Sequence, residues 1–190
     1  MATNKVKVTD ETPIVWADTT DYSSTVSGLT RTDQLDLTSL AAGAARQGVK
    51  HDFGVTRAQR YRVWVGIEFV GTSGVLSGEE IVIKHAGSPH TTPGKANPGG
   101  TSGADAVYTG TAGDSLDDSI AQLQLIGALV ATTDDTGVVQ YQTVGYLDGE
   151  SIERYGMPVV YNKTTGALMT DAVEMLIAYF PINDDIQAAA

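Results

Sequence analysis

A run of ten residues in the middle of the chain alternates between apolar and mostly polar side chains. It covers 60–69 and reads RYRVWVGIEF. Successive side chains of a β-strand point to opposite faces, so one face of this run would carry, in order, Tyr61, Val63, Val65, Ile67 and Phe69. An α-helix would scatter the same residues around its circumference. The run therefore predicts a strand with one buried and one solvent-exposed face.

Shorter strand signals recur along the rest of the chain. They lie at 6–8, 14–16, 35–40, 47–53, 81–85, 123–131, 138–147, 157–161 and 172–180. Turn residues at 134–137 and at 162–166 separate the last four, which predicts two β-hairpins. Many short strands and no long helical run predict an all-β fold, a jelly-roll-like antiparallel β-sandwich.

One short helix is expected just after the glycine-rich middle of the chain. Asp114 or Ser115 would cap its N-terminus, where a polar side chain can accept a backbone N–H. The spacing of Leu116, Ile120 and Leu123 places them on one helical face. Such a helix would close one end of the sandwich.

The segment 85–113 contains seven glycines and three prolines in 29 residues. A loop of this length is uncommon in a compact domain, so it is disordered, a binding loop, or an arm that lies on a neighbouring subunit. We favour contact with a partner, and we expect deletion of 89–103 to cost little stability.

The length of 190 residues suits one domain with a substantial core. We therefore expect a single sandwich over 1–190, with an N-terminal arm at about 1–20, the extended loop at about 85–113 and a short C-terminal tail at about 183–190.

The net charge is −11 and no cysteine occurs. A strongly negative chain repels nucleic acid, and the absence of cysteine suits a protein made in a reducing cytoplasm. The first 20 residues lack an apolar run, so no secretory signal is expected, and no stretch is apolar enough to span a membrane. We expect neither a nucleic acid nor a membrane as partner.

Charge is unevenly distributed along the chain. The stretch 31–62 has six basic and three acidic residues, whereas 105–190 has thirteen acidic and two basic residues. Both stretches are either ordinary solvated surface, or the means by which copies of the protein meet, basic face against acidic face.

The sequence offers no recognisable catalytic or metal-binding pattern. His51, His85 and His90 lack the spacing that places two imidazoles on one ion. The glycines of 87–95 superficially suggest a phosphate loop, but the segment contains two prolines and is followed by Ala96 where a serine or threonine is needed. No nucleophile elbow is present. We expect no catalytic residue, no cofactor and no metal, and a protein that is not an enzyme.

Several residues are better suited to contact with another protein. Trp64 falls on the polar face of the strand at 60–69, where a loop of the same chain or a partner must cover it. The strand at 172–180 is apolar on both faces, as are 123–131 and 138–147, which implies a covering layer or a subunit contact. The candidate interface residues are Trp64, Arg60, Arg62, Tyr108, Leu176 and Phe180.

A series of short segments in a fixed order resembles small virion proteins of tailed bacteriophages. The segments are NPGG (97–100), YTG (108–110), DSL (114–116), QLQLIGAL (122–129), RYGMPVVYN (154–162), DAVE (171–174) and PINDDIQ (181–187). The earlier stretch from DLTSLA (36–41) to Gly54 fits as well, so the resemblance covers most of the chain from Trp16 onward. It consists of structural segments, without a catalytic signature.

The resemblance implies a structural virion protein that decorates or cements the phage head. Its partner would be the major capsid protein or another virion protein, and it would form a trimer or dimer on the capsid surface after synthesis in the host cytoplasm. Two alternatives stay open. One is a component of the tail, neck or fibre base. The other is a carbohydrate-binding sandwich for host attachment, with Trp64 and Tyr108 as stacking platforms.

Overall fold

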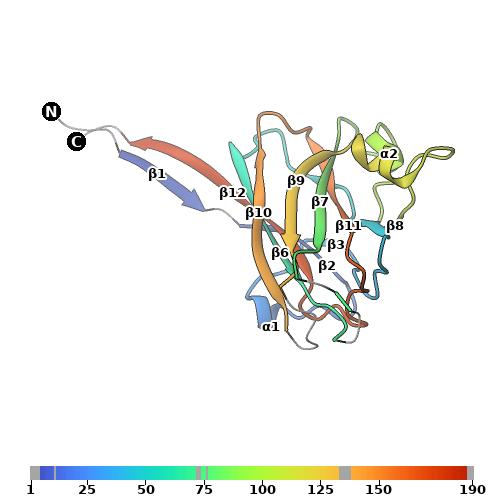
Figure 1. Cartoon of the computed structure of the whole chain (residues 1–190). Helices are drawn as coiled ribbons and strands as arrows, with labels where there is room; N and C mark the ends of the chain where they lie inside the picture. The colour runs from blue at the N-terminus through green and yellow to red at the C-terminus, as the bar shows by residue number, and fades with distance from the viewer. Residues whose placement is uncertain (1–4, 11, 72–73, 76, 133–137, 188–190) are drawn as a thin grey trace.

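The computed structural model describes residues 5–10, 12–71, 74–75, 77–132 and 138–187. Two six-stranded sheets, nearly all antiparallel, face each other and enclose the main hydrophobic core (Figure 1). The expected all-β sandwich is confirmed.

Sheet A has the strand order β10-β6-β12-β2-β3, and β1 pairs with the far end of β12. All its pairs are antiparallel except β2 with β3. Its strands are β1 (Lys5–Asp10), β2 (Ile14–Ala17), β3 (Asp33–Gln34), β6 (Arg60–Ile67), β10 (Gln140–Asp148) and β12 (Leu176–Gln187).

Sheet B has the order β8-β4-β11-β7-β9, and β5 pairs with β11. All its pairs are antiparallel. Its strands are β4 (Ala45–Gln47), β5 (His51–Asp52), β7 (Glu80–Ser88), β8 (Ala106–Tyr108), β9 (Gln124–Val130) and β11 (Tyr155–Asn162).

The alternating run forms the strand that the sequence predicts, as β6 over Arg60–Ile67. The side chains of Tyr61, Val63, Val65, Ile67 and Phe69 are at most 2% exposed, and they belong to the core between the sheets. Trp16 and Tyr179 lie in the same core with their ring centroids 4.7 Å apart. Because the opposite face of β6 is only partly covered, the strand has the two unlike faces that its alternation requires.

Each sheet also has a covering element on its outer face. The predicted helix is present as α2 (Leu116–Ala121), with Ser115 Oγ accepting the N–H of Asp118 at 3.1 Å. It packs Ile120 and Leu123 against Met157 and Val159 of sheet B. A second short helix, α1 (Ser24–Ser27), was not predicted, because four residues carry no helical periodicity.

The region of α1 covers part of the outer face of sheet A. Val15, Ala17, Leu176 and Ala178 are fully buried there, and Tyr22 and Leu29 on either side of α1 pack over them, together with Trp64 and Phe180. The two apolar faces of β12 are therefore explained by a covering layer within the same chain, which is one of the two expected outcomes.

The two predicted hairpins are wrong. Strand β9 pairs with β7 in sheet B, whereas β10 pairs with β6 in sheet A. Likewise, β11 belongs to sheet B and β12 to sheet A. The chain crosses between the layers at these connections, and local turn chemistry does not report such a crossing. The turn expected at 134–137 lies outside the described residues.

Two further expectations about local structure need correction. The strand predicted at 35–40 is absent, and the nearest strand, β3, covers only 33–34. Leu35, Leu37 and Leu40 are nevertheless at most 6% exposed, because the loop that contains them packs into the core. The strand predicted at 47–53 is split into β4 and β5.

The glycine-rich segment 85–113 is not an extended arm. It begins as part of β7, then includes the short 3-10 helix η1 (Pro98–Gly100), and ends in β8, which pairs with β4. Gly99 and Thr101 are buried. The segment is therefore a built part of sheet B and its surroundings.

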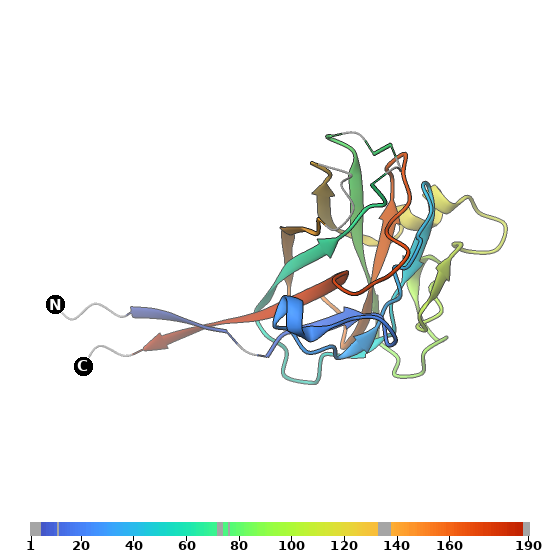
Figure 2. The same ribbon diagram turned by 90° about the horizontal axis from the view of Figure 1, so that it is seen from below.

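The two ends of the chain form a two-stranded ribbon. Strand β1 pairs with Ile182–Gln187 of β12, and both strands extend away from the sandwich in two perpendicular views (Figures 1 and 2). The expectation of an N-terminal arm over about 1–20 is wrong for 14–17, because β2 is a buried strand of sheet A. The short C-terminal tail expected at about 183–190 is in strand as far as Gln187.

Candidate interaction surface

The outer face of sheet A brings aromatic side chains from three strands together. Trp64 lies opposite Thr143 of β10 and Ala178 of β12, and Arg62 lies opposite Tyr146 and Phe180. Residues directly opposite in an antiparallel pair share a face of the sheet. The register thus gathers side chains that are more than 110 residues apart in sequence into one surface.

The rings of this surface contact one another closely. Trp64 stacks on Tyr141 with centroids 4.6 Å apart and planes 13° apart, and Phe180 meets Trp64 nearly edge-on at 6.2 Å. The guanidinium of Arg62 lies 4.9 Å from the centre of the Phe180 ring. We call these four residues, Arg62, Trp64, Tyr141 and Phe180, the aromatic patch. Mutual packing of this kind holds each ring in a defined position.

The aromatic patch is open to solvent on the side of β10. Tyr141 is 38% and Tyr146 is 59% exposed, while Arg62, Trp64 and Phe180 are half-buried. A hollow of about 390 Å³ separates the patch from Ser27 and Leu29 of the α1 region. The covering layer thus stops short of β6 and β10, and this part of sheet A faces outward.

Tyr141 sits where strand β6 has no side chain. A Cβ atom on Gly66 would come within 2.8 Å of two carbons of the Tyr141 ring, so the glycine makes room for it. Burial, and next the neighbouring Glu174, raise the pKa of the Tyr141 hydroxyl above its ordinary value. The hydroxyl therefore stays neutral at physiological pH, and an uncharged ring is well suited to a protein contact.

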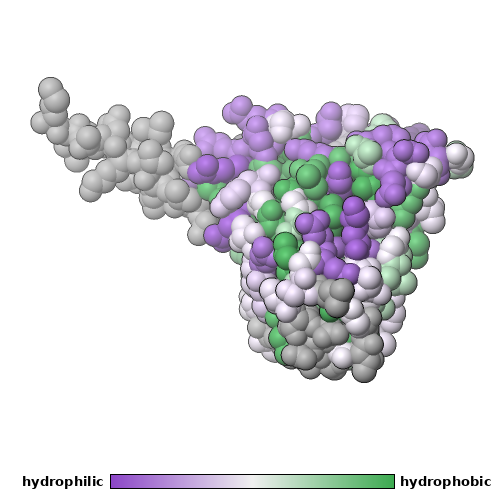
Figure 3. Space-filling model, in the orientation of Figure 1, coloured by the Kyte–Doolittle hydropathy of each residue, from purple (hydrophilic) through white to green (hydrophobic). Residues whose placement is uncertain are grey.

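A second group of exposed apolar residues lies on or next to β9 and β10. It consists of Leu125, Val130, Val138, Tyr141 and Tyr146, all at least 38% exposed. Figure 3 shows hydrophobic residues gathered over the region that β9 and β10 occupy in Figure 1. Tyr141 belongs to both groups and lines a shallow hollow with Val130 and Val138, whereas Leu125 lines a different hollow beside α2.

Of the six interface residues predicted from the sequence, four lie on this side of sheet A. Arg62, Trp64 and Phe180 are in the aromatic patch, and Arg60 is exposed two residues before Arg62 on β6. Sequence reasoning missed Tyr141 and Tyr146. The apolar residues on both faces of 138–147 are a signal that could have identified them.

The predictions for Tyr108 and Leu176 are wrong. Tyr108 is 2% exposed, and its hydroxyl donates to the carbonyl of Gly99 beneath the α2 region. Leu176 is completely buried beneath the α1 region. Both residues pack within the chain because each sheet has its own outer covering layer.

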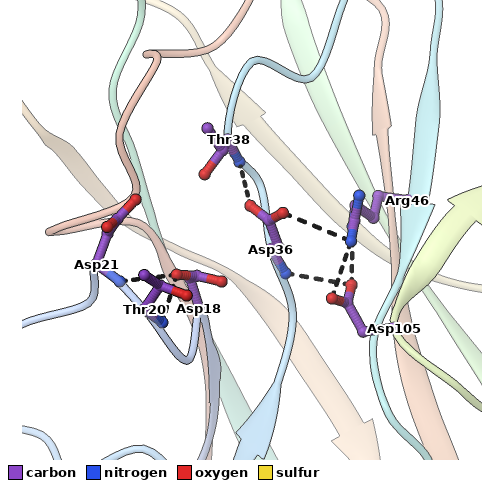
Figure 4. Close-up of polar contacts among 7 residues, drawn as sticks. All are labelled: Asp18, Thr20, Asp21, Asp36, Thr38, Arg46 and Asp105. Atoms are coloured by element: carbon purple, nitrogen blue, oxygen red, sulfur yellow. Dashed lines mark hydrogen bonds and ion pairs between the residues drawn. The ribbon is translucent and has the colours of Figure 1, made fainter.

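Several charges from the two unevenly charged stretches neutralise one another inside the chain. Arg46 donates two hydrogen bonds of 2.8 Å to Asp105, and its guanidinium lies 3.6 Å from Asp36 (Figure 4). The hydrogen bonds to Asp105 raise the pKa of Arg46. Arg154 pairs with Asp52 in the same bidentate way. These five charges are therefore poor candidates for contacts between copies.

A larger hollow, about 470 Å³, lies on the outer face of sheet B beside α2. Val82, Ala128 and Ile120 line it together with Lys84 and Lys163. Tyr161 crosses one side and donates to Asp117 at 3.0 Å. Its charges are mixed, and no group of reactive side chains converges on it.

Within the described residues, no three histidine, aspartate or glutamate side chains are placed to hold a metal ion. None of the helices in the described ranges is long and apolar enough to cross a membrane. Comparison with protein-family models, curated proteins and solved structures finds no match for this chain.

Proposed function

We propose that the chain is a structural virion protein that binds the capsid surface of a tailed bacteriophage and stabilises the head shell. The observation that supports a binding role most directly is the aromatic patch, which is partly exposed on rigid strands. The assignment to a phage head depends on the resemblance of short segments, over most of the chain from Trp16 onward, to small virion proteins.

The composition of the patch is typical of a protein interface. Tryptophan, tyrosine, phenylalanine and arginine are enriched at interfaces, and tryptophan, tyrosine and arginine most often dominate the binding energy. Strands β6, β10 and β12 hold the four patch side chains, so little conformational freedom is lost on binding. Repetition over a symmetric shell adds avidity, so each contact can be modest.

Substitution of Trp64 tests the role of the patch. We expect Trp64→Ala to weaken binding to shells that lack the protein by about 2 kcal/mol, roughly thirtyfold, because Tyr141 and Phe180 both pack against Trp64. Co-sedimentation with such shells measures the affinity. Trp64 lies outside the core between the sheets, so the variant should still unfold cooperatively.

Val107→Ala is a matched control, because Val107 is 59% exposed on sheet B, away from the patch. It should bind like the wild type. Tyr141→Ser removes an exposed patch ring and should also weaken binding. Unchanged affinity in both Trp64→Ala and Tyr141→Ser would show that another surface binds the shell.

A glycan is the second candidate ligand, because the hollow beside Trp64 is also lined by the hydroxyl residues Ser27 and Thr143. Two observations weigh against it. Tyr141 already stacks on Trp64, and Tyr108 is buried and cannot serve as a second platform. Saturable binding on a glycan array, lost in Trp64→Ala, would support the glycan.

A tail, neck or fibre-base location would use the same patch. The number of copies in purified particles separates these locations from the head, since a shell protein occurs in hundreds of copies and a neck or tail ring in few.

A further inference from the structure

The hollow beside the aromatic patch combines a largely apolar lining with one charged group. The described residues that line it are Ser27, Leu29, Arg62, Trp64, Thr143 and Phe180. Arg62 is the only charged residue among these six, so the hollow is cationic in a chain whose net charge is −11. A cationic site on an acidic chain selects for a particular kind of partner.

The guanidinium of Arg62 is held in place while its N–H groups stay unused. Arg62 is half-buried, and its guanidinium lies over the ring of Phe180. Contact with a ring face leaves the N–H groups, which lie in the guanidinium plane, able to bond elsewhere. Across the described ranges, no residue forms a side-chain hydrogen bond or an ion pair with this guanidinium. Such a group favours a carboxylate, which it can bind through two parallel hydrogen bonds.

The strand register places the neighbouring acidic residues away from Arg62. Both residues opposite Arg62, one on β10 and one on β12, are aromatic. Asp148 of β10 lies opposite Arg60, and the acidic residues of β12 lie beyond the last residue that pairs with β6. Glu174 neighbours Tyr141 at the other end of the patch and does not line the hollow. The register therefore gives Arg62 no acidic partner on the adjacent strands.

The hydroxyl groups of the hollow add little further polar recognition. Ser27 is already used within the chain, because its Oγ bonds to the hydroxyl of Tyr22 and accepts the N–H of Leu29. Polar recognition in the hollow thus depends on Arg62 and Thr143. One cation beside an apolar space suits a ligand with one acidic group and one apolar group, whereas a sugar would need several polar partners.

We propose that the segment of the shell protein that docks on the aromatic patch presents a carboxylate next to a bulky apolar side chain. The carboxylate accepts hydrogen bonds from Arg62, and the apolar side chain fills the hollow between Trp64 and Leu29. The volume of about 390 Å³ is near the lower end for ligand pockets, so it suits one large side chain. The shell as partner rests on the proposed function, whereas the acidic and apolar chemistry follows from the hollow itself.

A pair of small probes tests the hollow without any shell. Hydrocinnamate carries a phenyl ring and a carboxylate, and hydrocinnamamide has nearly the same shape without the charge. We expect the acid to bind with a dissociation constant of about 1–10 mM, as its few atoms allow, and the amide to bind about fivefold more weakly or worse. NMR titration of the Trp64 indole N–H measures both affinities. The other tryptophan, Trp16, is fully buried and serves as an internal reference.

Substitution of Arg62 tests the same chemistry on shells. Arg62→Gln should weaken binding to shells that lack the protein by about tenfold, and should bring the affinities for the two probes together, because the cation is lost. Arg62→Lys should restore part of the loss, since lysine keeps the charge without the planar fork. Arg31→Gln is the matched control at an exposed arginine that does not line the hollow, and it should bind like the wild type.

The outcomes separate this inference from the proposed function. Equal affinity of the wild type for the two probes, or no response of Trp64 to either, would overturn the acidic chemistry, and neither result requires a variant that folds. Shell binding that Trp64→Ala weakens but Arg62→Gln leaves unchanged would overturn it as well. A wild type that distinguishes the probes but ignores shells would remove the proposed function and leave the chemistry of the hollow standing.

Discussion

Lys50 organises the start of the glycine-rich segment through a single ammonium group. Its Nζ donates to the carbonyls of His90 and Thr92 at 3.0 Å and of Lys95 at 3.2 Å, and to Ser88 Oγ at 3.0 Å. Ser88 Oγ in turn contacts two of the same carbonyls. Burial lowers the pKa of Lys50. A segment rich in glycine and proline is thus ordered by polar contacts and needs little apolar core of its own.

Removal of this ammonium should loosen the segment. We expect Lys50→Met to reduce the free energy of unfolding by about 1–3 kcal/mol, because several backbone carbonyls lose a charged donor. Urea unfolding measures the loss. Lys95→Met, with an exposed side chain in the same segment, should change stability little. Equal stability of the two variants would mean that the glycines and prolines order the segment without Lys50.

The same contacts alter the expectation for deletion of 89–103. Lys50, Gly99 and Thr101 connect this stretch to buried structure, so the deletion should destabilise the fold, contrary to the small cost that segment length alone predicts.

Among the elements, β9 and β10 decide how the two sheets join. In the pairing of β9 with β7, Ile126 has no partner, and in the pairing of β10 with β6, Val144 has none. Each of the two strands therefore has a bulge, and the two bulges lie next to each other. Gly127 and Gly145 lie beside these bulges. A Cβ atom on Gly127 would collide with the carbonyl of Val144, and one on Gly145 with the carbonyl of Ile126. Bulges bend strands, and here the glycines let the two backbones touch as they turn into different sheets.

A methyl group at this crossing should separate the sheets. We expect Gly127→Ala to cost about 3 kcal/mol, because the new atom meets backbone that cannot move aside. Gly145→Ala should behave similarly. The midpoint of chemical unfolding measures the effect. Gly94→Ala is the control, since the nearest atom to its added Cβ is 3.9 Å away. A near-neutral Gly127→Ala would contradict the tight crossing.

At the scale of the whole molecule, His85 connects the two sheets through the core. It is 2% exposed in β7, and its Nδ1 lies 3.5 Å from the hydroxyl of Tyr179 in β12. Its Nε2 is buried without a hydrogen-bond partner among the described residues. Burial lowers the pKa of His85 from 6.5 to about 4, and burial also raises the pKa of Tyr179. Both side chains are therefore neutral at physiological pH.

This pKa makes the stability of the fold depend on pH. Between pH 6.5 and about 4, His85 binds a proton in the unfolded chain but not in the folded one. Proton binding in this range stabilises the unfolded state relative to the folded state. The contribution of His85 to the free energy of unfolding is therefore complete above pH 6.5 and falls as the pH drops towards 4. The loss amounts to about 3 kcal/mol by its end.

Urea unfolding across this pH range measures the loss. His85→Leu should remove this part of the slope, whereas His90→Gln, at an exposed histidine, should keep it. A slope that is the same in His85→Leu and the wild type would show that other groups cause it.

The strand signals in the sequence predicted the fold class correctly. The alternation of 60–69 predicted the buried face of β6, and the cap at Ser115 predicted helix α2. Each of these depends on neighbours in sequence, because side-chain direction repeats every two residues in a strand and an N-cap acts within one turn. The same local pattern identified Trp64, Arg62 and Phe180 as candidates for a surface.

Only the tertiary structure decided which strands share a sheet and which apolar faces stay open. Tyr108 and Leu176 look like surface residues in sequence, yet distant segments cover them, while Tyr141 reaches Trp64 only because β10 joins sheet A. The pairing of β1 with the last residues of β12 likewise depends on segments from opposite ends of the chain meeting. Local sequence sets the direction of each side chain, but its burial depends on contacts with residues far along the chain, and those form only when the sheets assemble.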